Sequence, residues 1–320
     1  MAVAILLVGG LGTRLMPLTR NTPKPMLTVA GIPVTEHQLM MAKAAGIKEI
    51  VLATSYLSEV FTPYFGDGSK WGMNIKYAVE KEPLGTGGAI ANAAQLLETK
   101  ESIVILNGDV LSSHDLSEQI RQHEANDADV TLHLTQVEDA RAFGCVPTDV
   151  QGRVTAFLEK MDSPVTNQIN AGCYVFNPRV ISAIPLETVV SVERETFPKL
   201  VSDGAKVYGY IENAYWLDIG TPKALLKAST DIVLRSGPGL VMPGAQVDAT
   251  AVIAGGSCIG QGSAVGAGTN IRGSVVEAGV KIGRDVVIEN SFVATGAIVL
   301  DGAKIGATFV TKEEILPIPL

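Results

Sequence analysis

Cysteine is scarce in this sequence, since 320 residues contain only Cys145, Cys173 and Cys258, far apart along the chain. Their odd number and the lack of metal-ligand spacing argue against a disulfide framework and against a cysteine-based zinc site. We interpret them as small apolar core residues in a reducing, cytoplasmic compartment. The opening MAVAILLVGG has no basic segment before its apolar run. We therefore interpret it as a buried first strand rather than a signal peptide.

Long apolar runs and basic clusters are also missing. No run approaches the roughly 20 apolar residues that span a bilayer, which argues against a membrane protein. The net charge is −8 and no basic cluster exceeds two residues. This argues against nucleic acid as a partner, because binding a phosphate backbone needs a dense positive face. A phosphorylated small molecule would have to be held by backbone N–H groups, a few cations and a metal ion.

What is present favours two domains, because the chain is about twice the usual domain length and 47 % of its residues are hydrophobic. Up to residue 235, strand-like and helix-like patterns alternate. Strands are predicted over 2–8, 49–54, 75–79, 102–106 and 153–158. Helices are predicted over 35–45, over 89–97 and, after a capping box of Asp115 and Glu118, up to 124. The alternation predicts an α/β, Rossmann-like, mostly parallel sheet over residues 1–235, with ligands beyond the carboxyl ends of its strands.

After the linker signal Ser236-Gly237-Pro238-Gly239 the helical period disappears. Aliphatic residues then recur every six positions, interrupted by two five-residue steps, at Val247, Ile253, Ile259, Val265, Ile271, Val276, Ile282, Ile288, Val293, Val299 and Ile305. This hexapeptide pattern predicts a short left-handed parallel β-helix of about three coils over residues 240–320. The alternative is a β-sandwich segment rich in glycine and valine. The ends of such a stack need covering, so we expect it to pack on the first domain or to form a homo-oligomer.

A glycine-rich turn follows the first predicted strand, with the sequence Gly9-Gly10-Leu11-Gly12-Thr13-Arg14-Leu15. Such a turn lets backbone N–H groups surround a phosphate. It is not a P-loop, because it lacks Gly-Lys-Ser/Thr, and it is not a dinucleotide fingerprint, because Leu15 replaces the third glycine. Lys24 follows between Pro23 and Pro25, whose rings stiffen the backbone and reduce the entropy lost when Lys24 is ordered on an anion.

Together, Val8–Thr19 and Pro23-Lys24-Pro25 resemble the signature of the sugar-1-phosphate nucleotidyltransferases. In that family the loop wraps a triphosphate, and cations matching Arg14 and Lys24 neutralise it. Members often carry a second arginine where this chain has Met16. The resemblance continues at Glu82-Pro83-Leu84-Gly85-Thr86-Gly87-Gly88, the family's nucleobase segment, although this stretch could also be a plain loop and helix start. It implies a nucleotide site made of Leu7, Gly9, Gly10, Gly12, Thr13, Arg14, Lys24, Gly85, Thr86 and Gly108.

Two aspartates match the family's magnesium ligands. Asp109 follows an apolar strand in Asn107-Gly108-Asp109, and Asp218 lies in Trp216-Leu217-Asp218-Ile219-Gly220. Mg²⁺ prefers oxygen ligands and keeps several waters, so two carboxylates and substrate phosphates suffice. The resemblance therefore implies Mg²⁺ as the cofactor, with Arg14, Lys24 and Asp109 as the catalytic residues.

Three further segments resemble the family's sugar site. They are Phe143-Gly144-Cys145-Val146, Phe157-Leu158-Glu159-Lys160 and Gln168-Ile169-Asn170-Ala171-Gly172. The match implies close approach of the sugar ring at Gly144, hydroxyl contacts from Glu159 and Asn170, and a 1-phosphate contact from Lys160, with Asp218 at the same site. Glu159 and Lys160 could instead form an ordinary exposed charge pair.

Within this family the sequence is most similar to the mannose-1-phosphate guanylyltransferases. The similarity is carried by Leu7-Val8-Gly9-Gly10, by Ile169–Tyr174, by Ser191–Pro198 and by Tyr215–Gly220. It implies that GTP and mannose 1-phosphate react to give GDP-mannose and diphosphate. Two alternatives stay open: a glucose-1-phosphate nucleotidyltransferase that uses UTP, dTTP or ATP, and a non-catalytic relative that senses a nucleotide sugar. An acyltransferase in the β-helix is disfavoured, because no histidine follows His133.

Overall fold

The computed structural model describes residues 2–10, 12–55 and 57–318, so Leu11 of the glycine-rich turn lies outside the described residues. The chain divides into two compact units. The first unit contains Met1–Leu11 and Thr35–Trp216, and the second contains Gly12–Val34 and Leu217–Leu320. The predicted domain limits of 1–235 and 240–320 remain a prediction. Within the described part of the chain, every helix falls short of the length and apolarity that crossing a bilayer would need.

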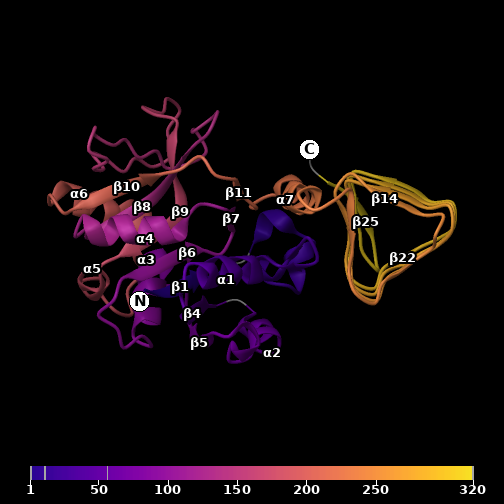
Figure 1. The fold of residues 1–320 in the computed structure, drawn as a ribbon, viewed down its shortest axis with the longest axis horizontal. Coiled ribbons are helices and arrows are strands. Elements are labelled where there is room, and N and C mark those ends of the chain that lie inside the picture. The colour runs from indigo at the N-terminus through magenta and orange to yellow at the C-terminus, as the bar shows by residue number, and fades with distance from the viewer. Residues whose placement is uncertain (1, 11, 56, 319–320) are drawn as a thin grey trace. The chain divides into compact units, whose positions relative to one another are not determined.

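The first unit is built on a seven-stranded sheet with the order β10-β8-β9-β6-β1-β4-β5 (Figure 1). All neighbouring pairs are parallel except those of β9, which runs antiparallel to β6 and β8. The strands are β1 (Val3–Leu7), β4 (Glu49–Thr54), β5 (Asn74–Val79), β6 (Ile103–Asn107), β8 (Val130–Gln136), β9 (Gln168–Phe176) and β10 (Val207–Ile211). The prediction of a mostly parallel sheet is confirmed, and four of its strands lie within one residue of the predicted limits.

Three helices correspond to the predicted ones: α1 (Val34–Ala44), α3 (Gly85–Ala94) and α4 (Leu116–Ala125). Asp115 caps α4 by accepting from Glu118 N–H at 3.0 Å. The predicted capping box is only half formed, because Asp115 N–H donates to Glu212 instead of Glu118. Shorter helices are α2 (Phe61–Phe65), α5 (Pro178–Ser182) and α6 (Phe197–Ser202).

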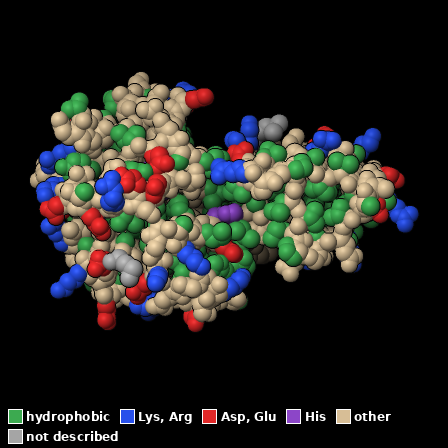
Figure 2. Space-filling model, in the orientation of Figure 1, with side chains coloured by type: hydrophobic (Ala, Val, Ile, Leu, Met, Phe, Trp, Pro, Cys, Tyr) green, Lys and Arg blue, Asp and Glu red, His purple; other side chains and the backbone are tan. Residues whose placement is uncertain are grey.

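The core of the first unit lies where the strands carry apolar residues on both faces. Ile5, Ile105, Tyr174 and Phe176 are fully buried in one cluster, together with Ile90 from α3. Burial on both faces explains why β1 and β6 are almost entirely apolar in sequence. On the face drawn in Figure 2, basic and acidic side chains are interspersed at the surface.

The predicted strand over 153–158 is wrong. Only isolated bridges occur there, because the segment changes its pairing partner along its length. Val154 N–H donates to Val207 O, whereas Leu158 N–H donates to Cys145 O. A segment that leaves one neighbour for another cannot form a continuous ladder.

The second unit contains a parallel β-helix, which confirms the prediction from the hexapeptide pattern. Figure 1 shows its strands stacked as a triangular coil with three sheets. One sheet has β12 (Gly239–Val241), β15 (Ser257–Ile259), β18 (Val275–Val276), β21 (Phe292–Val293), β24 (Thr308–Val310) and the antiparallel β25 (Ile315–Pro317). The second has β13 (Gln246–Val247), β16 (Ala264–Val265), β19 (Lys281–Ile282) and β22 (Ile298–Val299). The third has β14 (Val252–Ala254), β17 (Asn270–Arg272), β20 (Val287–Glu289) and β23 (Lys304–Gly306).

All of the predicted aliphatic positions lie in these strands, and the two five-residue steps shorten the coil. Ile253 pairs with Ile271 before the first step, and Ile271 pairs with Ile288 after it. Buried hydroxyls connect the shortened coils, since Ser257 Oγ accepts from Ser274 N–H, 17 residues on, at 3.1 Å. Ser274 Oγ accepts from Ser291 N–H in the same way. The pattern missed β12, β24 and β25, so the stack extends beyond the predicted repeats at both ends.

The second unit also holds the end of the glycine-rich turn and the segment that follows it. It contains the short 3-10 turns Thr13–Leu15, Leu18–Arg20 and Lys24–Met26, the hairpin β2 (Thr28–Val29) and β3 (Ile32–Pro33), and, further along the chain, α7 (Pro222–Leu234). Ala30 N–H donates to Ser229 Oγ of α7 at 2.9 Å. Ala30 also packs in an apolar cluster with Val233, Cys258 and Met242. Segment Gly12–Val34 is therefore held by α7 and by the first coils of the β-helix.

Candidate active site

Four neighbouring parallel strands of the first unit end at the same edge of the sheet. Leu7 at the end of β1 pairs with Ala53 of β4 and with Asn107 of β6. Thr54 of β4 in turn pairs with Val79 of β5. The residues that directly follow these strands therefore meet at one edge, the usual place for ligands in open α/β sheets.

A pocket of about 610 Å³ opens at this edge. Its volume lies in the range typical of small-molecule sites. The pocket is lined by Leu7, Gly9, Gly10, Ala53, Ser55, Glu80, Lys81, Glu82, Pro83, Gly85, Thr86 and Ala89. Five of the residues predicted to bind the nucleotide, Leu7, Gly9, Gly10, Gly85 and Thr86, are among them.

Gly108, a sixth predicted nucleotide residue, is required by packing. Its N–H donates to Leu7 O at 2.9 Å. A Cβ at this position would collide with that same carbonyl oxygen. Glycine thus lets the turn that carries Asp109 lie directly against the end of β1.

The glycines in the first turn of α3 also have a structural reason. Gly85 has a φ of 69°, and a Cβ there would lie 2.6 Å from Val190 O. Gly87 N–H, at the start of the helix, donates to the same oxygen at 2.7 Å, which satisfies a donor that has no partner inside the helix. The stretch from Glu82 to Gly88 therefore does contain the start of a helix, which is one of its two interpretations from the sequence. Gly85 and Thr86 nevertheless line the pocket as well.

Glu80, which is not among the residues predicted for the site, directly follows β5 and lines this pocket. Its Oε1 is buried and has no hydrogen-bond partner among the described residues. Burial raises the pKa of the Glu80 carboxyl, and the backbone N–H of Leu84 partly offsets this increase. The signal that selected Asp109, a carboxylate shortly after a strand, applies equally to Glu80.

The three segments predicted to bind the sugar lie together in the first unit. Cys145 N–H donates to Leu158 O at 2.8 Å, directly before Glu159 and Lys160. Asn170 N–H donates to Gly144 O at 3.0 Å. Glu159 is half-buried, and Lys160 is exposed.

In the second unit, Gly12 and Lys24 are packed together by a local turn. Thr19 Oγ1 donates to Gly12 O at 2.9 Å. A Cβ on Gly12 would lie only 3.0 Å from the Cβ of Lys24. Lys24 is 9 % exposed, whereas Thr13 and Arg14 are exposed.

Arg14 and Asp218 also approach one another within the second unit, at Gly220. A Cβ on Gly220 would lie 2.8 Å from Asp218 Oδ1 and 2.9 Å from Arg14 Nη2. Gly220 N–H donates to Asp218 Oδ1 at 2.7 Å. The absence of a side chain at position 220 therefore leaves room for a guanidinium and a carboxylate side by side. Asp218 itself ends β11 (Trp216–Asp218).

The two predicted metal ligands, Asp109 in the first unit and Asp218 in the second, are both carboxylates. Among the described residues, no group of three or more His, Cys, Asp or Glu side chains could hold a metal by itself. Carboxylate oxygens suit Mg²⁺, which takes its remaining ligands from water and substrate phosphates.

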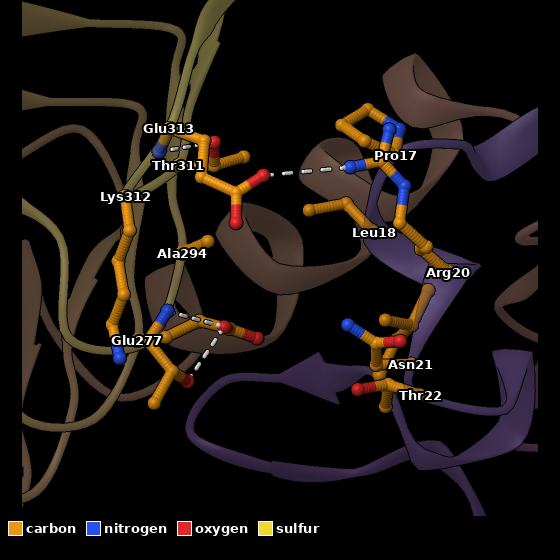
Figure 3. A pocket seen from close by; sticks show the side chains of 12 residues that line it. Pro17, Leu18, Arg20, Asn21, Thr22, Glu277, Ala294, Thr311, Lys312 and Glu313 are labelled. Carbon is orange, nitrogen blue, oxygen red and sulfur yellow. Dashed lines mark hydrogen bonds and ion pairs between the residues drawn. The ribbon is translucent and has the colours of Figure 1, made fainter.

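A second pocket, of about 280 Å³, lies within the second unit and contains none of the predicted site residues. Figure 3 shows Arg20, Asn21 and Thr22 on one side and Glu277, Lys312 and Glu313 on the other. The Glu277 carboxylate accepts from Thr295 N–H and Thr295 Oγ1, each at 2.8 Å. Burial raises the pKa of Glu277. Its bonds therefore tie neighbouring coils of the β-helix to one another.

Residues 3–234, which include both the edge pocket and the Gly12–Lys24 turn, match the nucleotidyl transferase family. The chain belongs to this family. A mannose-1-phosphate guanylyltransferase of Mycobacterium tuberculosis is 49 % identical over 297 residues, which cover 89 % of this chain and 82 % of that protein. Mannose-1-phosphate guanylyltransferase 1 of Arabidopsis thaliana is 35 % identical over 293 residues, with coverage of 89 % and 81 %.

Solved structures of similar proteins agree with this membership in the nucleotidyl transferase family. The crystal structure of HddC from Yersinia pseudotuberculosis, complexed with GMP-PN, has a TM-score of 0.62 and 28 % identity. It covers 72 % of this chain and 100 % of that chain. A putative glucose-1-phosphate thymidylyltransferase from Bacillus anthracis has a TM-score of 0.65 with 21 % identity, covering 72 % and 94 %, and supports the fold alone. The family predicted from the glycine-rich turn is therefore confirmed.

Proposed function

We propose that this protein transfers a guanylyl group from GTP to mannose 1-phosphate, forming GDP-mannose and diphosphate. The names of its relatives support this pair of substrates. The observation in this chain that carries the choice of guanine is Glu80, which lines the pocket and whose buried Oε1 has no hydrogen-bond partner among the described residues.

A carboxylate suits guanine better than the other bases. Guanine presents two adjacent donors, N1–H and the N2 amino group, and an ionised carboxyl group offers two acceptor oxygens. Adenine places the acceptor N1 beside its amino group, and uracil and thymine offer one N–H between two carbonyls. These bases would leave the buried carboxylate with an unsatisfied or opposed oxygen, which costs about 1–3 kcal/mol. Binding of guanine would restore the stabilisation that Glu80 loses by burial.

Glu80→Gln tests this assignment. Replacing one acceptor by a donor should lower kcat/KM for GTP about 10- to 100-fold, since a hydrogen bond to a charged group contributes about 1.5–3 kcal/mol. ITP lacks the N2 amino group, so the wild-type protein should prefer GTP to ITP, and the variant should lose most of this preference. Glu82→Gln, at an exposed position on the wall of the same pocket, is the matched control. A Glu80→Gln variant that still prefers GTP as strongly as the wild type would refute the assignment.

In the proposed reaction, an oxygen of the sugar 1-phosphate attacks the α-phosphorus of GTP, and diphosphate leaves in line. Both reactants are anions, so charge repulsion and orientation are the main obstacles. Backbone N–H groups of Gly9 and Gly10 would bind the triphosphate, and Arg14 and Lys24 would neutralise the departing diphosphate. No general base is needed, because the attacking phosphate is already ionised.

The sugar side of the proposal uses the three segments around Gly144. Lys160 would bind the 1-phosphate, while Glu159 and Asn170 would contact ring hydroxyls. Their assignment is supported by the backbone bonds that hold Leu158 and Asn170 against Gly144 and Cys145. These bonds give the sugar segments a fixed relation to one another, which orientation of the nucleophile requires.

We further propose that Asp109 and Asp218 hold Mg²⁺. When bound, the ion would reduce the charge repulsion between the two phosphate groups. The carboxylates would position it, and the Arg14 guanidinium beside Asp218 would limit the negative charge there.

Cellular location and assembly are also part of the proposal. Cys145, Cys173 and Cys258 are buried free thiols, which suits the cytoplasm. A homo-oligomer formed through the β-helix is supported by Ile298 and Leu300, which are 65 % and 75 % exposed. Light scattering should report a multimer, and a concentration-independent monomer would refute that assembly.

A further inference from the structure

The segment Ser191–Pro198 has no role in the proposed chemistry, yet its first turn points a carboxylate into the first unit. Val192–Thr196 forms one π-helical turn, a rare conformation that often occurs at functional sites. Within this turn Glu193 is half-buried. Its Oε2 accepts from Thr86 Oγ1 at 2.8 Å and from Ser191 Oγ at 3.2 Å.

Thr86 lines the nucleotide pocket, and its hydroxyl group both donates and accepts a hydrogen bond. It donates to Glu193, and it accepts from Val192 N–H at 3.0 Å. With donor and acceptor both used, the hydroxyl has one orientation. The π-helical turn thus fixes a residue of the pocket wall that lies more than 100 positions earlier in the chain.

The other oxygen of Glu193 is bound by Tyr174, which is fully buried in β9. Tyr174 Oη donates to Glu193 Oε1 at 3.4 Å and accepts from Asn170 Nδ2 at 2.9 Å and from Asn107 Nδ2 at 3.4 Å. Burial, aided by the charge of Glu193, raises the pKa of Tyr174 well above its ordinary value. Tyr174 is therefore a neutral phenol whose one donor and two acceptor positions are all occupied.

Three segments with different proposed tasks meet in this network. Thr86 belongs to the nucleotide pocket, Asn170 to the sugar segments, and Asn107 ends the strand that leads to Asp109. Packing alone would not require such a network, because burying a carboxylate beside a phenol carries a desolvation penalty that apolar side chains avoid.

We propose that Glu193 and Tyr174 are positioning residues that hold the nucleotide, sugar and metal-binding segments in the mutual arrangement needed for in-line attack. This inference rests on the proposed function. Neither residue needs to contact a substrate. Their effect follows from geometry, because a displacement of about 1 Å between reacting groups can reduce the rate about 100-fold.

Tyr174→Phe and Glu193→Gln test the inference. Tyr174→Phe removes one hydroxyl and keeps the ring, which packs on Phe197 with centroids 5.0 Å apart. Each variant should lower kcat roughly 10- to 100-fold, with KM for either substrate changed less than about 3-fold, since binding contacts remain. The double variant should be little worse than the poorer single variant, because both changes break the same network.

Glu195→Gln is the matched control, since it makes the same charge change in the same turn at an exposed position. Thermal unfolding of every variant establishes the folded fraction, and kcat is expressed per folded protein. Turnover is measured with whichever nucleotide and sugar 1-phosphate the wild type uses best. A different best pair would thus overturn the proposed substrates without affecting the comparison of variants. Control-like kcat in Tyr174→Phe and Glu193→Gln, or a loss confined to thermal stability, would overturn the positioning role.

Discussion

The β-helix and the seven-stranded sheet unit organise their contacts in opposite ways. In the β-helix each inward aliphatic residue meets its equivalent one coil away, as Ile271 meets Ile288. In the sheet unit the decisive contacts each occur only once and join residues that are far apart in the sequence, such as Gly108 with Leu7 and Glu193 with Thr86. A repeated contact can be replaced or lost as one of many. A unique contact has no substitute, so we expect single substitutions to affect chemistry in the sheet unit, whereas stability should be distributed over the repeated contacts of the β-helix.

The largest effect should come from a unique carboxylate. Asp109→Asn should lower turnover at least about 100-fold, because it removes charge where two anionic phosphates must meet, and it should leave the fold intact. Diphosphate release and circular dichroism measure the two properties. Glu124→Gln, on an exposed turn of α4, is the charge-matched control. Near-normal turnover of Asp109→Asn would remove the proposed metal role.

A core substitution in the β-helix should have the opposite signature. Ile288 is fully buried, so Ile288→Ala should lower the free energy of unfolding by about 2–5 kcal/mol. Turnover per folded protein should stay within about 2-fold of wild type, since the residue lies in the repeated stack. Ile315→Ala, at a position that is 63 % exposed, loses the same atoms and should cost under about 1 kcal/mol. If Ile288→Ala abolished turnover in fully folded protein, the separation of roles between the two regions would fail.

The pH dependence of stability should also separate the regions, because all four histidines precede residue 134. Burial lowers the pKa of His133 to about 3 and that of His123 to about 4. Between these values and about 6.5 the unfolded chain binds more protons than the folded chain, so stability is complete above pH 6.5 and is lost as the pH falls.

Each of these two histidines should reduce the free energy of unfolding by roughly 2 kcal/mol between pH 7.5 and pH 5. His133→Leu should flatten this dependence, since neither ring nitrogen of His133 has a hydrogen-bond partner among the described residues. Urea unfolding at the two pH values provides the measurement. An unchanged pH dependence in the variant would show that His133 does not titrate on unfolding.

How much could be predicted from the sequence differs between the regions for the same physical reason. The β-helix strands at Val247 to Ile305 follow from a period that each residue shares with its neighbours. The strands that end at Leu7 and Asn107 follow from their apolar runs. The partner of a segment, in contrast, is not encoded in its own pattern. Residues 153–158 look like a strand locally, but two different partners prevent a ladder.

The predicted site shows the same limit. Resemblance selected residues such as Thr86 and Asn170, and motif spacing could not reveal that Tyr174 and Glu193 connect them. Glu80 carries a local signal, its position directly after a strand. Its importance emerges only from the burial of Oε1 without a partner, which depends on the neighbouring elements.

The most direct test of the proposed function is diphosphate release with Mg²⁺ across a grid of substrates. GTP, ATP, UTP and dTTP are each combined with the 1-phosphates of mannose, glucose and N-acetylglucosamine. The proposed function predicts a dominant signal for GTP with mannose 1-phosphate, and loss of the GTP preference in Glu80→Gln. Preference for another nucleotide and sugar pair, or nucleotide-sugar binding without turnover in any combination, would contradict it.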